Sequence, residues 1–468
     1  MRLFISIVLC KVLYFVGSLV GKGSSLPGQI ALRICPDVLK KVKLPKTVIA
    51  ITGSNGKTST AELITRSLEA DGRSVGWNRE GSNQTEGVAT LVLRTSSLSG
   101  TIKKDALVLE CDERYAKRIF ENIKPTALLV TNLCRDQLTR NGHYEFIGNC
   151  IREAINVAGK DVKLVLNADD PYVSALAYSE DLGGGIAELI SDASWFGIGS
   201  DFILEGSSEL ITTTNHYIYD DGAFCPICKS KMTYKYRVAG HYGDYSCTVC
   251  GFLRQKPNFE AEKIDYSSGE TTIRINTAEK SRTIETTLAL PSLVGAYNLT
   301  AAIATTCTAE TTAEDSAKAL DKYELKGGRT IQFSAYGRDG VLLIAKHENS
   351  FAYNQSLLWA VLQKKPCTIV IMVDSISRKY YTSETSWLWD IGFDILEDEN
   401  VKDVVLVGKY SSELAMRFAV SAVNPQKVSC IHEPMELKNH LRKSTSGEIY
   451  AITCFSDKAK LIQSLEGA

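Results

Sequence analysis

The sequence predicts an α/β protein built around a doubly wound parallel sheet that binds a nucleotide. Three observations point to this fold class. Short apolar strands alternate with helical segments, polar residues follow the carboxyl ends of the strands, and a glycine-containing turn joins one strand to the start of a helix. At 468 residues the chain is long for a single core, so about two to four domains are expected.

The strand–turn–helix segment lies at residues 47–60. Val48–Ile51 is apolar and mostly β-branched, which favours a buried strand, and a helix is expected from Lys57 to about Leu68. In such a segment the loop amides hold phosphate oxygens, Lys57 neutralises the terminal phosphates, and the hydroxyl of Thr58 reaches Mg²⁺. The residues assigned to the nucleotide here are Gly53, Ser54, Asn55, Gly56, Lys57, Thr58 and Ser59. The first glycine of the full G-x-x-x-x-G-K-[ST] pattern would fall at Ile51, so a plain glycine turn is the alternative.

Further strands and polar strand ends follow along the chain. Val75–Asn78 predicts a strand end, and Gly87–Leu93 predicts a helix after a polar loop. The buried strands expected next are Ala106–Glu110, Ala127–Asn132 and Val162–Leu166. Ligands in such sheets bind beyond the carboxyl ends of strands, and a carboxylate there can hold Mg²⁺, so Glu110 is the first candidate for this role. A solvated acid at a strand end is the alternative.

Charge and cysteine content restrict the class of protein. A net charge of −1 gives no electrostatic case for a nucleic-acid partner. The 13 cysteines are scattered without the pattern of a secreted disulfide framework, which favours the cytoplasm. Leu3–Val20 is apolar, but Lys11 near its middle disfavours a spanning helix. A docked or membrane-surface amphipathic helix is expected there, with a signal or anchor as the alternative.

Two C-x₂-C pairs predict a structural zinc site. They are Cys225, Cys228, Cys247 and Cys250, and the gap between the pairs is close to that of zinc ribbons. Four thiolates close a tetrahedral site and leave no open position for chemistry, so the ion would be structural. Reduced turns or disulfides are the alternative reading of these pairs.

The last third of the chain predicts a second, smaller α/β domain. Leu290–Asn298 precedes a small-residue helix at Leu299–Cys307, and the glycine-rich Lys326–Arg329 marks a domain boundary. The strands expected beyond it are Val341–Ala345, Thr368–Val373, Asp403–Val407 and Ile449–Ile452, with helices such as Ser411–Phe418 between them. The expected division is an N-terminal helical segment (1–45), a central ATP-binding domain (46–328, with an insertion at about 215–260) and a C-terminal domain (329–468).

Four stretches resemble motifs of the Mur ligase superfamily. Thr52–Thr58 resembles its ATP-binding loop T-G-[ST]-N-G-K-[ST], which accounts for the missing first glycine. The other three are Thr131–Arg140, similar to T-N-x-x-x-D-H-x-D-R, Asn167–Pro171, similar to N-x-D-D-P, and Gly295–Asn298, similar to G-x-[HY]-N. This resemblance implies a Mur-ligase-type central P-loop ATPase domain with the four-cysteine zinc ribbon inserted in it, followed by a smaller Rossmann-like C-terminal domain.

Within the superfamily the sequence is more similar to the MurT family, the Mur-ligase-like subunits of enzymes that amidate peptidoglycan precursor. Those subunits carry a four-cysteine ribbon and lack the usual UDP-binding first domain, and here the ATP loop already begins at Gly53. Further similarities are Leu26–Gly28, Asn78-x-x-Gly81-x-Asn83, Glu110-x-Asp112-Glu113, Arg135–Gln137 and Ser386–Asp390. The chain departs from the family pattern at Thr139, Lys346–Phe351, Glu384 and Thr453–Ser456, so the ATP end is better preserved than the substrate end.

The resemblance implies that the γ-phosphoryl group of ATP is transferred to a carboxylate and that an amine attacks the acyl phosphate. The implied cofactors are ATP, Mg²⁺ and Zn²⁺, with Lys57 at the β/γ-phosphates and Thr58 and Glu110 at Mg²⁺. The residues that it places at or near the nucleotide are Asn132, Asn167, Asp170, Asn298 and Arg329. Where many relatives have a metal-holding His, this chain has Gln137.

The implied substrate is the α-carboxyl of the D-glutamyl residue in lipid II, and the implied product is D-isoglutamine. Because the chain shows no nucleophile elbow with a cysteine, ammonia would come from a separate glutaminase subunit of the GatD type. Asp390 or Glu384 is the candidate to complete the Cys-His pair of that partner, and a core segment with a capping acid is the alternative. The implied location is the cytoplasm, at the inner face of the plasma membrane, with peripheral membrane contact.

Two other functions would also be compatible with a nucleotide-binding loop, and they lead to different expectations. A non-catalytic ATP-binding scaffold would explain the departures as lost ligase chemistry. An amino-acid-adding ligase similar to folylpolyglutamate synthetase would use an amino acid in place of ammonia. The zinc ribbon argues against the latter enzyme, and the missing UDP-binding domain argues against an ordinary Mur ligase.

Overall fold

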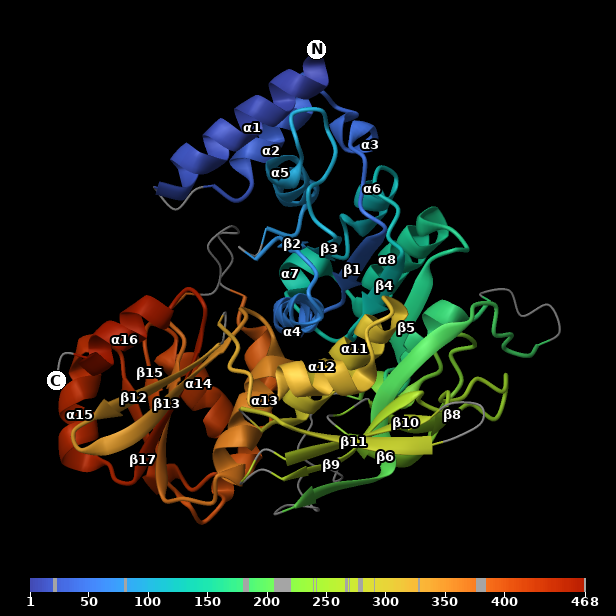
Figure 1. Ribbon diagram of the computed structural model, residues 1–468. Coiled ribbons are helices and arrows are strands. Elements are labelled where there is room, and N and C mark those ends of the chain that lie inside the picture. Colours follow the sequence, from blue (N-terminus) through green and yellow to red (C-terminus); the bar gives the residue numbers. More distant parts are fainter. Residues whose placement is uncertain are drawn as a thin grey trace.

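The chain folds into a large central sheet, a smaller C-terminal sheet and a short two-stranded ribbon (Figure 1). The computed structural model describes residues 1–19, 23–79, 82–179, 185–205, 220–238, 240, 242–265, 268, 270–276, 281–289, 291–326, 329–375 and 384–466. Of the residues named above, Val20, Gly81, Leu290, Gly327 and Gly328 lie outside this part of the chain.

The central sheet has nine strands in the order β11-β10-β9-β6-β5-β4-β1-β3-β2. Their bounds are β1 (Thr47–Thr52), β2 (Val75–Trp77), β3 (Ala106–Glu110), β4 (Ala127–Val130), β5 (Lys163–Asn167), β6 (Ala193–Glu205), β9 (Phe259–Asp265), β10 (Glu270–Asn276) and β11 (Ser281–Thr287). The strands from β2 across to β9 pair in parallel, as the sequence predicted. One edge of the sheet departs from the parallel arrangement, because β9, β10 and β11 are antiparallel. The links between these three strands are too short for the crossover that parallel pairing requires.

Helices cover both faces of the central sheet. One face packs against α4 (Lys57–Ala70), α11 (Leu293–Thr308) and α12 (Ala313–Leu320). The other face packs against α5 (Thr85–Thr95), α6 (Ala116–Phe120) and α8 (Tyr144–Ala158). Three N-terminal helices, α1 (Arg2–Leu19), α2 (Leu26–Ile34) and α3 (Val38–Lys41), lie beyond α5 at the top of the molecule (Figure 1). The short helices α7 (Leu138–Asn141) and α9 (Pro171–Ser174) follow strand ends.

The start of α11 differs from the expectation. The sequence predicted a helix at Leu299–Cys307 with Gly295–Asn298 before it, but α11 begins at Leu293 and contains that motif. The reason is the cap at Ser292, whose hydroxyl accepts a hydrogen bond of 2.9 Å from the amide of Gly295. Asn298 therefore projects from within the helix.

The C-terminal sheet has six strands in the order β12-β13-β17-β14-β15-β16. Their bounds are β12 (Thr330–Ala335), β13 (Arg338–Ala345), β14 (Cys367–Met372), β15 (Val401–Val407), β16 (Val428–Ile431) and β17 (Glu448–Cys454). All pairs are parallel except β12 with β13, so the predicted second α/β sheet is present. Its helices are α13 (Ser350–Leu362) and α14 (Ser411–Phe418) on one side and α15 (Leu437–Ser444) and α16 (Lys458–Glu466) on the other.

The two-stranded ribbon lies where the central and C-terminal domains meet. Its strands are β7 (Thr233–Val238) and β8 (Tyr242–Ser246). The ring of Tyr242 lies 5.7 Å from that of Tyr297 in α11 and 5.7 Å from that of Phe351 in α13. One hydrophobic cluster consequently runs from the central sheet through these rings into the C-terminal domain.

Candidate active site

The loop between β1 and α4 is shaped by two glycines. Gly53 and Gly56 have positive φ angles of 124° and 83°. A Cβ atom at Gly53 would lie 2.4 Å from the hydroxyl of Thr131, and one at Gly56 would lie 2.3 Å from Oδ1 of Asn298. Both positions therefore demand glycine. Gly56 caps α4 without a side-chain hydrogen bond, so the first amides of the helix are available to an anion such as phosphate.

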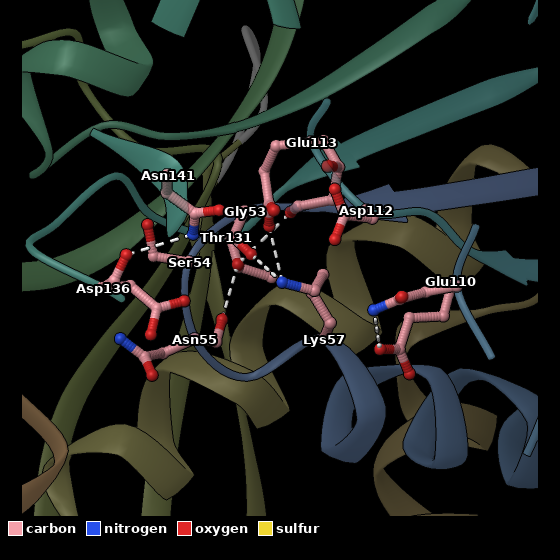
Figure 2. A network of polar contacts seen from close by, with 12 residues as sticks. Gly53, Ser54, Asn55, Lys57, Glu110, Asp112, Glu113, Thr131, Asp136 and Asn141 are labelled. Carbon is pink, nitrogen blue, oxygen red and sulfur yellow. Dashed lines mark hydrogen bonds and ion pairs between the residues drawn. The ribbon is translucent and has the colours of Figure 1, made fainter. Parts of the chain in front are cut away.

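Lys57 is buried at the first position of α4 and faces acids. Figure 2 shows its ammonium group turned towards the carbonyl of Gly53 and the carboxylate of Glu113, to both of which it donates hydrogen bonds. Its Nζ lies 2.5 Å from Oε1 of Glu113, and the two side chains are only 6% and 5% exposed. Burial works against its charge, but Glu113, Glu110 and Asp136 outweigh burial and raise the pKa of Lys57. The lysine is thus held as a cation beside the loop.

Thr58 and Glu110 are brought together as the sequence predicted for a magnesium site. The hydroxyl of Thr58 donates a hydrogen bond of 2.8 Å to Oε2 of Glu110, and Asn83 donates one of 3.1 Å to Oε1. Asn78 fixes the backbone of Glu110 by two hydrogen bonds of 2.8 Å, one donated and one accepted. Hydroxyl and carboxylate oxygens are suitable ligands for Mg²⁺, so these residues fit that ion.

Three other predicted nucleotide residues hold the loop itself. Asn132 accepts a hydrogen bond of 2.8 Å from the amide of Asn55 and donates one of 3.1 Å to its carbonyl. Asn167 donates to the carbonyl of Thr131 at 3.0 Å. Asp170 caps α9 and accepts from the amide of Leu133 at 2.7 Å. Their polar atoms have partners within the protein, and direct contact of these residues with the nucleotide stays a prediction.

The C-terminal domain reaches into the phosphate loop through two residues. Lys346 donates hydrogen bonds of 2.5 Å to the carbonyl of Ser54 and 3.0 Å to Asp136. Asn349, which is fully buried, donates to Asn55 at 3.0 Å and to Asp136 at 2.7 Å. Burial lowers the pKa of Lys346, and Asp136 opposes this effect. Sequence reasoning treated this segment only as a departure from the family pattern, because its partners lie more than 200 residues away.

Asn298 and Arg329 approach the loop from other elements. Oδ1 of Asn298 faces the space above Gly56, so its side chain is in contact with the turn that precedes Lys57. The exposed Arg329 interacts electrostatically with Asp136 and Glu110. Its guanidinium makes no ion pair with any described residue, which leaves a cation for an anionic ligand.

The four cysteines converge as the sequence predicted. Their sulfur atoms all lie within 4.8 Å of one another, with 3.7 Å between Cys225 and Cys250 and 3.4 Å between Cys228 and Cys247. Zn–S bonds of about 2.3 Å place tetrahedral sulfurs about 3.8 Å apart, so the cluster fits zinc. Burial opposes ionisation of Cys228, but hydrogen bonds from Ser230 and Cys247 outweigh burial and lower its pKa to about 6, which favours the thiolate.

The two candidate triad acids have different surroundings. Asp390 accepts hydrogen bonds of 3.0 and 3.1 Å from Nη1 of Arg135, whose other nitrogens bind Asp221 before the zinc ribbon. Burial raises the pKa of Asp390, and Arg135 opposes this rise. Glu384 is exposed and accepts a hydrogen bond of 2.7 Å from the amide of Ser386. The structure therefore shows Asp390 in an interdomain ion pair and Glu384 at the surface.

Comparisons with known proteins agree with this geometry. A model of the Mur ligase middle domain matches residues 51–182, and a model of the MurT ligase C-terminal domain matches residues 347–457. The chain is 26% identical to the lipid II isoglutaminyl synthase (glutamine-hydrolyzing) subunit MurT of Staphylococcus aureus, over 99% of this chain and 98% of that protein. It is 27% identical to the MurT subunit of Streptococcus pneumoniae over 89% of this chain and 86% of that protein.

Solved structures show the same fold. A pseudomurein peptide ligase type C from Methanothermus fervidus superposes with a TM-score of 0.68 at 20% identity, covering 92% of this chain and 81% of that one. MurF ligase from Thermotoga maritima, in complex with ADP, superposes with a TM-score of 0.60 at 15% identity, covering 94% and 83%. The fold and the loop around Lys57 define a Mur-ligase-type, ATP-dependent ligase.

Within that class the chain is similar to MurT subunits along nearly its whole length. This similarity agrees with the four-cysteine cluster, which the sequence had linked to MurT subunits.

Proposed function

We propose that this ligase amidates the α-carboxyl of the D-glutamyl residue in the stem peptide of lipid II, giving D-isoglutamine, with ammonia supplied by a glutaminase partner of the GatD type. The observation that supports this most is similarity to MurT subunits along nearly the whole chain, together with a phosphate loop whose lysine, threonine and acidic partner stand together. The name of those relatives, lipid II isoglutaminyl synthase (glutamine-hydrolyzing) subunit MurT, supplies the substrate and the glutamine-dependent reaction.

The arrangement suits a phosphoryl transfer followed by an acyl transfer. A carboxylate oxygen of the substrate attacks the γ-phosphorus, the bond from that phosphorus to the ADP oxygen breaks, and an acyl phosphate forms. The lone pair of ammonia then adds to the acyl carbon, phosphate leaves with the original carboxyl oxygen, and the nitrogen loses a proton. Such chemistry depends chiefly on alignment and charge neutralisation.

Residues of the chain can supply that neutralisation from two domains. The amides of Ser54 and Asn55 bond Asn132, so in this proposal Lys57, the amide of Gly56 and the first amides of α4 take the β- and γ-phosphates. Thr58 and Glu110 would hold Mg²⁺, which when bound neutralises phosphate charge. Lys346 lies against the same loop from the C-terminal domain. Lys57 and Lys346 belong to different domains. Both cations lie at the phosphate loop only when the two domains are in contact, so the reaction would be favoured only in that arrangement.

The source of ammonia calls for a partner subunit. No described residue of the chain forms a nucleophilic Cys-His pair, and the cysteines of the ribbon fit zinc instead. For the partner's Cys-His pair we favour Glu384 as the acid that this chain could offer on its own, because Asp390 would first have to leave Arg135.

The decisive experiment uses the chain with its glutaminase partner, lipid II, ATP, Mg²⁺ and glutamine carrying heavy nitrogen in its amide. ADP release and incorporation of one heavy nitrogen into lipid II are expected, and heavy oxygen in the substrate carboxyl should appear in the released phosphate. Lys57→Ala should abolish both, whereas Lys160→Ala, a substitution of an exposed lysine, should not.

Each rival function has its own outcome in this assay. Binding of ATP without turnover in the complete mixture would support the scaffold. Turnover that requires an added amino acid rather than glutamine would support an amino-acid-adding ligase. Full activity of Lys57→Ala would reject the phosphate-loop mechanism itself.

A further inference from the structure

Helix α1 presents apolar side chains on two faces. Ile7 and Cys10 are fully buried against the protein, whereas Val12, Phe15 and Leu19 are 53%, 67% and 74% exposed. With 3.6 residues per turn the exposed apolar residues fall on one side of the helix. They form one stripe, here named the apolar stripe: Met1, Phe4, Ile5, Val12, Phe15, Val16 and Leu19. No acidic residue lies in this helix, which is the one described helix long and apolar enough to span a membrane. A contiguous apolar surface of this kind marks an interaction site.

The inner face of α1 packs against the rest of the protein, so the helix lies along the protein surface (Figure 1). Lys11 donates a hydrogen bond of 2.8 Å to the carbonyl of Arg94 at the end of α5. The hydroxyl of Ser6 donates to the carbonyl of Ala31 in α2 at 3.3 Å. A helix that crossed a membrane would have to give up these contacts and leave Lys11 in the hydrocarbon. The contacts therefore favour a helix that lies flat at an interface.

A basic pocket lies beside the helix. It has a volume of about 540 Å³, and its lining includes Lys11, Tyr14, Arg94, Lys103 and Lys104. No acid is among its described lining residues, and the neighbouring Asp105 is turned to Ser74, whose hydroxyl donates to it at 2.6 Å. Cations gathered in a pocket next to an apolar surface fit the phosphate group of a lipid.

The charge of the N-terminal segment agrees with such a ligand. Residues 1–46 contain eight lysines and arginines and a single acid, Asp37, whereas the whole chain has a net charge of −1. Asp37 is itself paired with Lys41 at 2.7 Å. The positive charge is therefore concentrated in the segment that carries the apolar stripe, which is the combination that anionic membranes attract.

We propose that α1 lies in the surface of an anionic membrane, with the apolar stripe among the acyl chains and the basic pocket on lipid phosphate groups. The inference gives the membrane contact expected from the sequence a surface and a lipid charge, and its test does not depend on the amidation reaction. The N-terminal helices are also tied to the catalytic site, because Ser25 hydrogen-bonds Ser82 at 2.5 Å and the adjacent Asn83 holds Glu110. Membrane docking would thus place the metal-binding carboxylate at a fixed position relative to a lipid-linked substrate.

Cosedimentation with vesicles tests the proposal without ATP or substrate. The full chain is mixed with vesicles of phosphatidylcholine alone or with added phosphatidylglycerol, at low and high salt. Val12→Glu/Val16→Glu places two charges on the apolar stripe, and Met416→Glu/Val420→Glu is the matched control on exposed residues of the C-terminal domain. Lys103→Glu/Lys104→Glu tests the pocket, and circular dichroism checks that each variant is folded.

The wild type and the C-terminal control are expected to bind phosphatidylglycerol vesicles, with weaker binding at high salt. The stripe variant and the pocket variant should each bind at least about tenfold more weakly. Equal binding to neutral and anionic vesicles, or equal loss in the stripe and control variants, would overturn the proposal. Unchanged vesicle binding with loss of the glutaminase partner in Val12→Glu/Val16→Glu would also overturn it, because a protein would then cover the stripe. If the amidation assay fails while vesicle binding behaves as expected, only the proposed reaction is lost.

Discussion

Lys57 and Glu113 form a buried ion pair across the phosphate loop, with 2.5 Å between Nζ and Oε1. The pair joins the first residue of α4 to the acidic segment after β3, and both side chains are almost inaccessible. A phosphate ligand would present a second anion to the same ammonium group. Glu113 is therefore the counter-ion that holds Lys57 charged, a role that the sequence had not indicated.

Glu113→Gln should destabilise the protein by about 3–5 kcal/mol, because it leaves a buried ammonium without its counter-ion. ATP or tripolyphosphate should then raise the melting temperature more in the variant than in the wild type, since the ligand replaces the lost charge. Thermal unfolding with and without ligand measures both effects. Glu153→Gln is the control, because Glu153 pairs with Lys117 at the surface and should matter little. Equal ligand shifts in the variant and the wild type would argue against Lys57 as a phosphate ligand.

Asn349→Ser should separate the role of Asn349 at the phosphate loop from its role in starting α13. Serine can still cap the helix, but it is too short to reach Asn55 and Asp136. Loss of these contacts, at about 1–3 kcal/mol, should lower ATP turnover about tenfold or more. The assay is ADP release in the complete reaction mixture. Asn424→Ser, a change at an exposed cap of the same domain, should leave turnover unchanged. Wild-type turnover in Asn349→Ser would mean that this contact is not needed for reaction.

Cys247→Ser should reduce bound zinc from one ion per chain to well below one and lower the melting temperature. Four sulfur ligands close the site, so removal of one opens it. Metal analysis of the purified chain and thermal unfolding measure the two effects. Cys430→Ser removes an exposed thiol outside the cluster and should change neither. A full zinc content in Cys247→Ser would show that these cysteines do not form the site.

Arg135→Ala should destabilise the protein more at about pH 7 than at about pH 4. Burial raises the pKa of Asp390 and Arg135 opposes the rise, so removal of Arg135 moves the folded-state pKa further up. A group whose pKa is raised by folding contributes stability below its unfolded pKa and loses that contribution as pH rises through the folded value. The loss of stability caused by Arg135→Ala is therefore larger at about pH 7 than at about pH 4. Melting temperatures across this pH range measure it.

Arg135→Ala/Asp390→Asn is the control for this prediction. It removes the titrating carboxylate of Asp390. The loss of stability relative to the wild type should therefore differ less between about pH 7 and about pH 4 than it does in Arg135→Ala. A loss of equal size at both pH values in Arg135→Ala would mean that Asp390 does not respond to Arg135.

The local parts of the site were predictable from sequence. A β-branched run, two glycines and Gly-Lys-Thr specify strand, turn and helix within a dozen residues, and β1 and α4 lie where expected. The C-x₂-C pairs likewise fix their own turns, with Lys229 and Gly251 in left-handed conformations after the second cysteine of each pair.

The parts that depend on domain packing were not predictable. Nothing near Lys346 or Asn349 in the sequence indicates that they meet Asp136, because this contact arises only when the C-terminal domain lies against the central one. Asn167 and Asp170 illustrate the same limit. Their motif predicted proximity to the nucleotide, which stays a prediction, but it did not indicate that the two side chains hold the backbone of Thr131 and Leu133.

The position of Tyr242 has a consequence for how these ligases respond to metal supply. Its ring touches an aromatic residue of each large domain, and it lies on the hairpin next to the four cysteines. Loss of zinc from the cysteine cluster would disorder this hairpin. The contacts of the Tyr242 ring with Tyr297 and Phe351, which join the central and C-terminal domains, would then be lost. Catalysis would then slow although every nucleotide ligand is intact, so zinc deprivation would resemble a fault in interdomain motion rather than one in ATP binding.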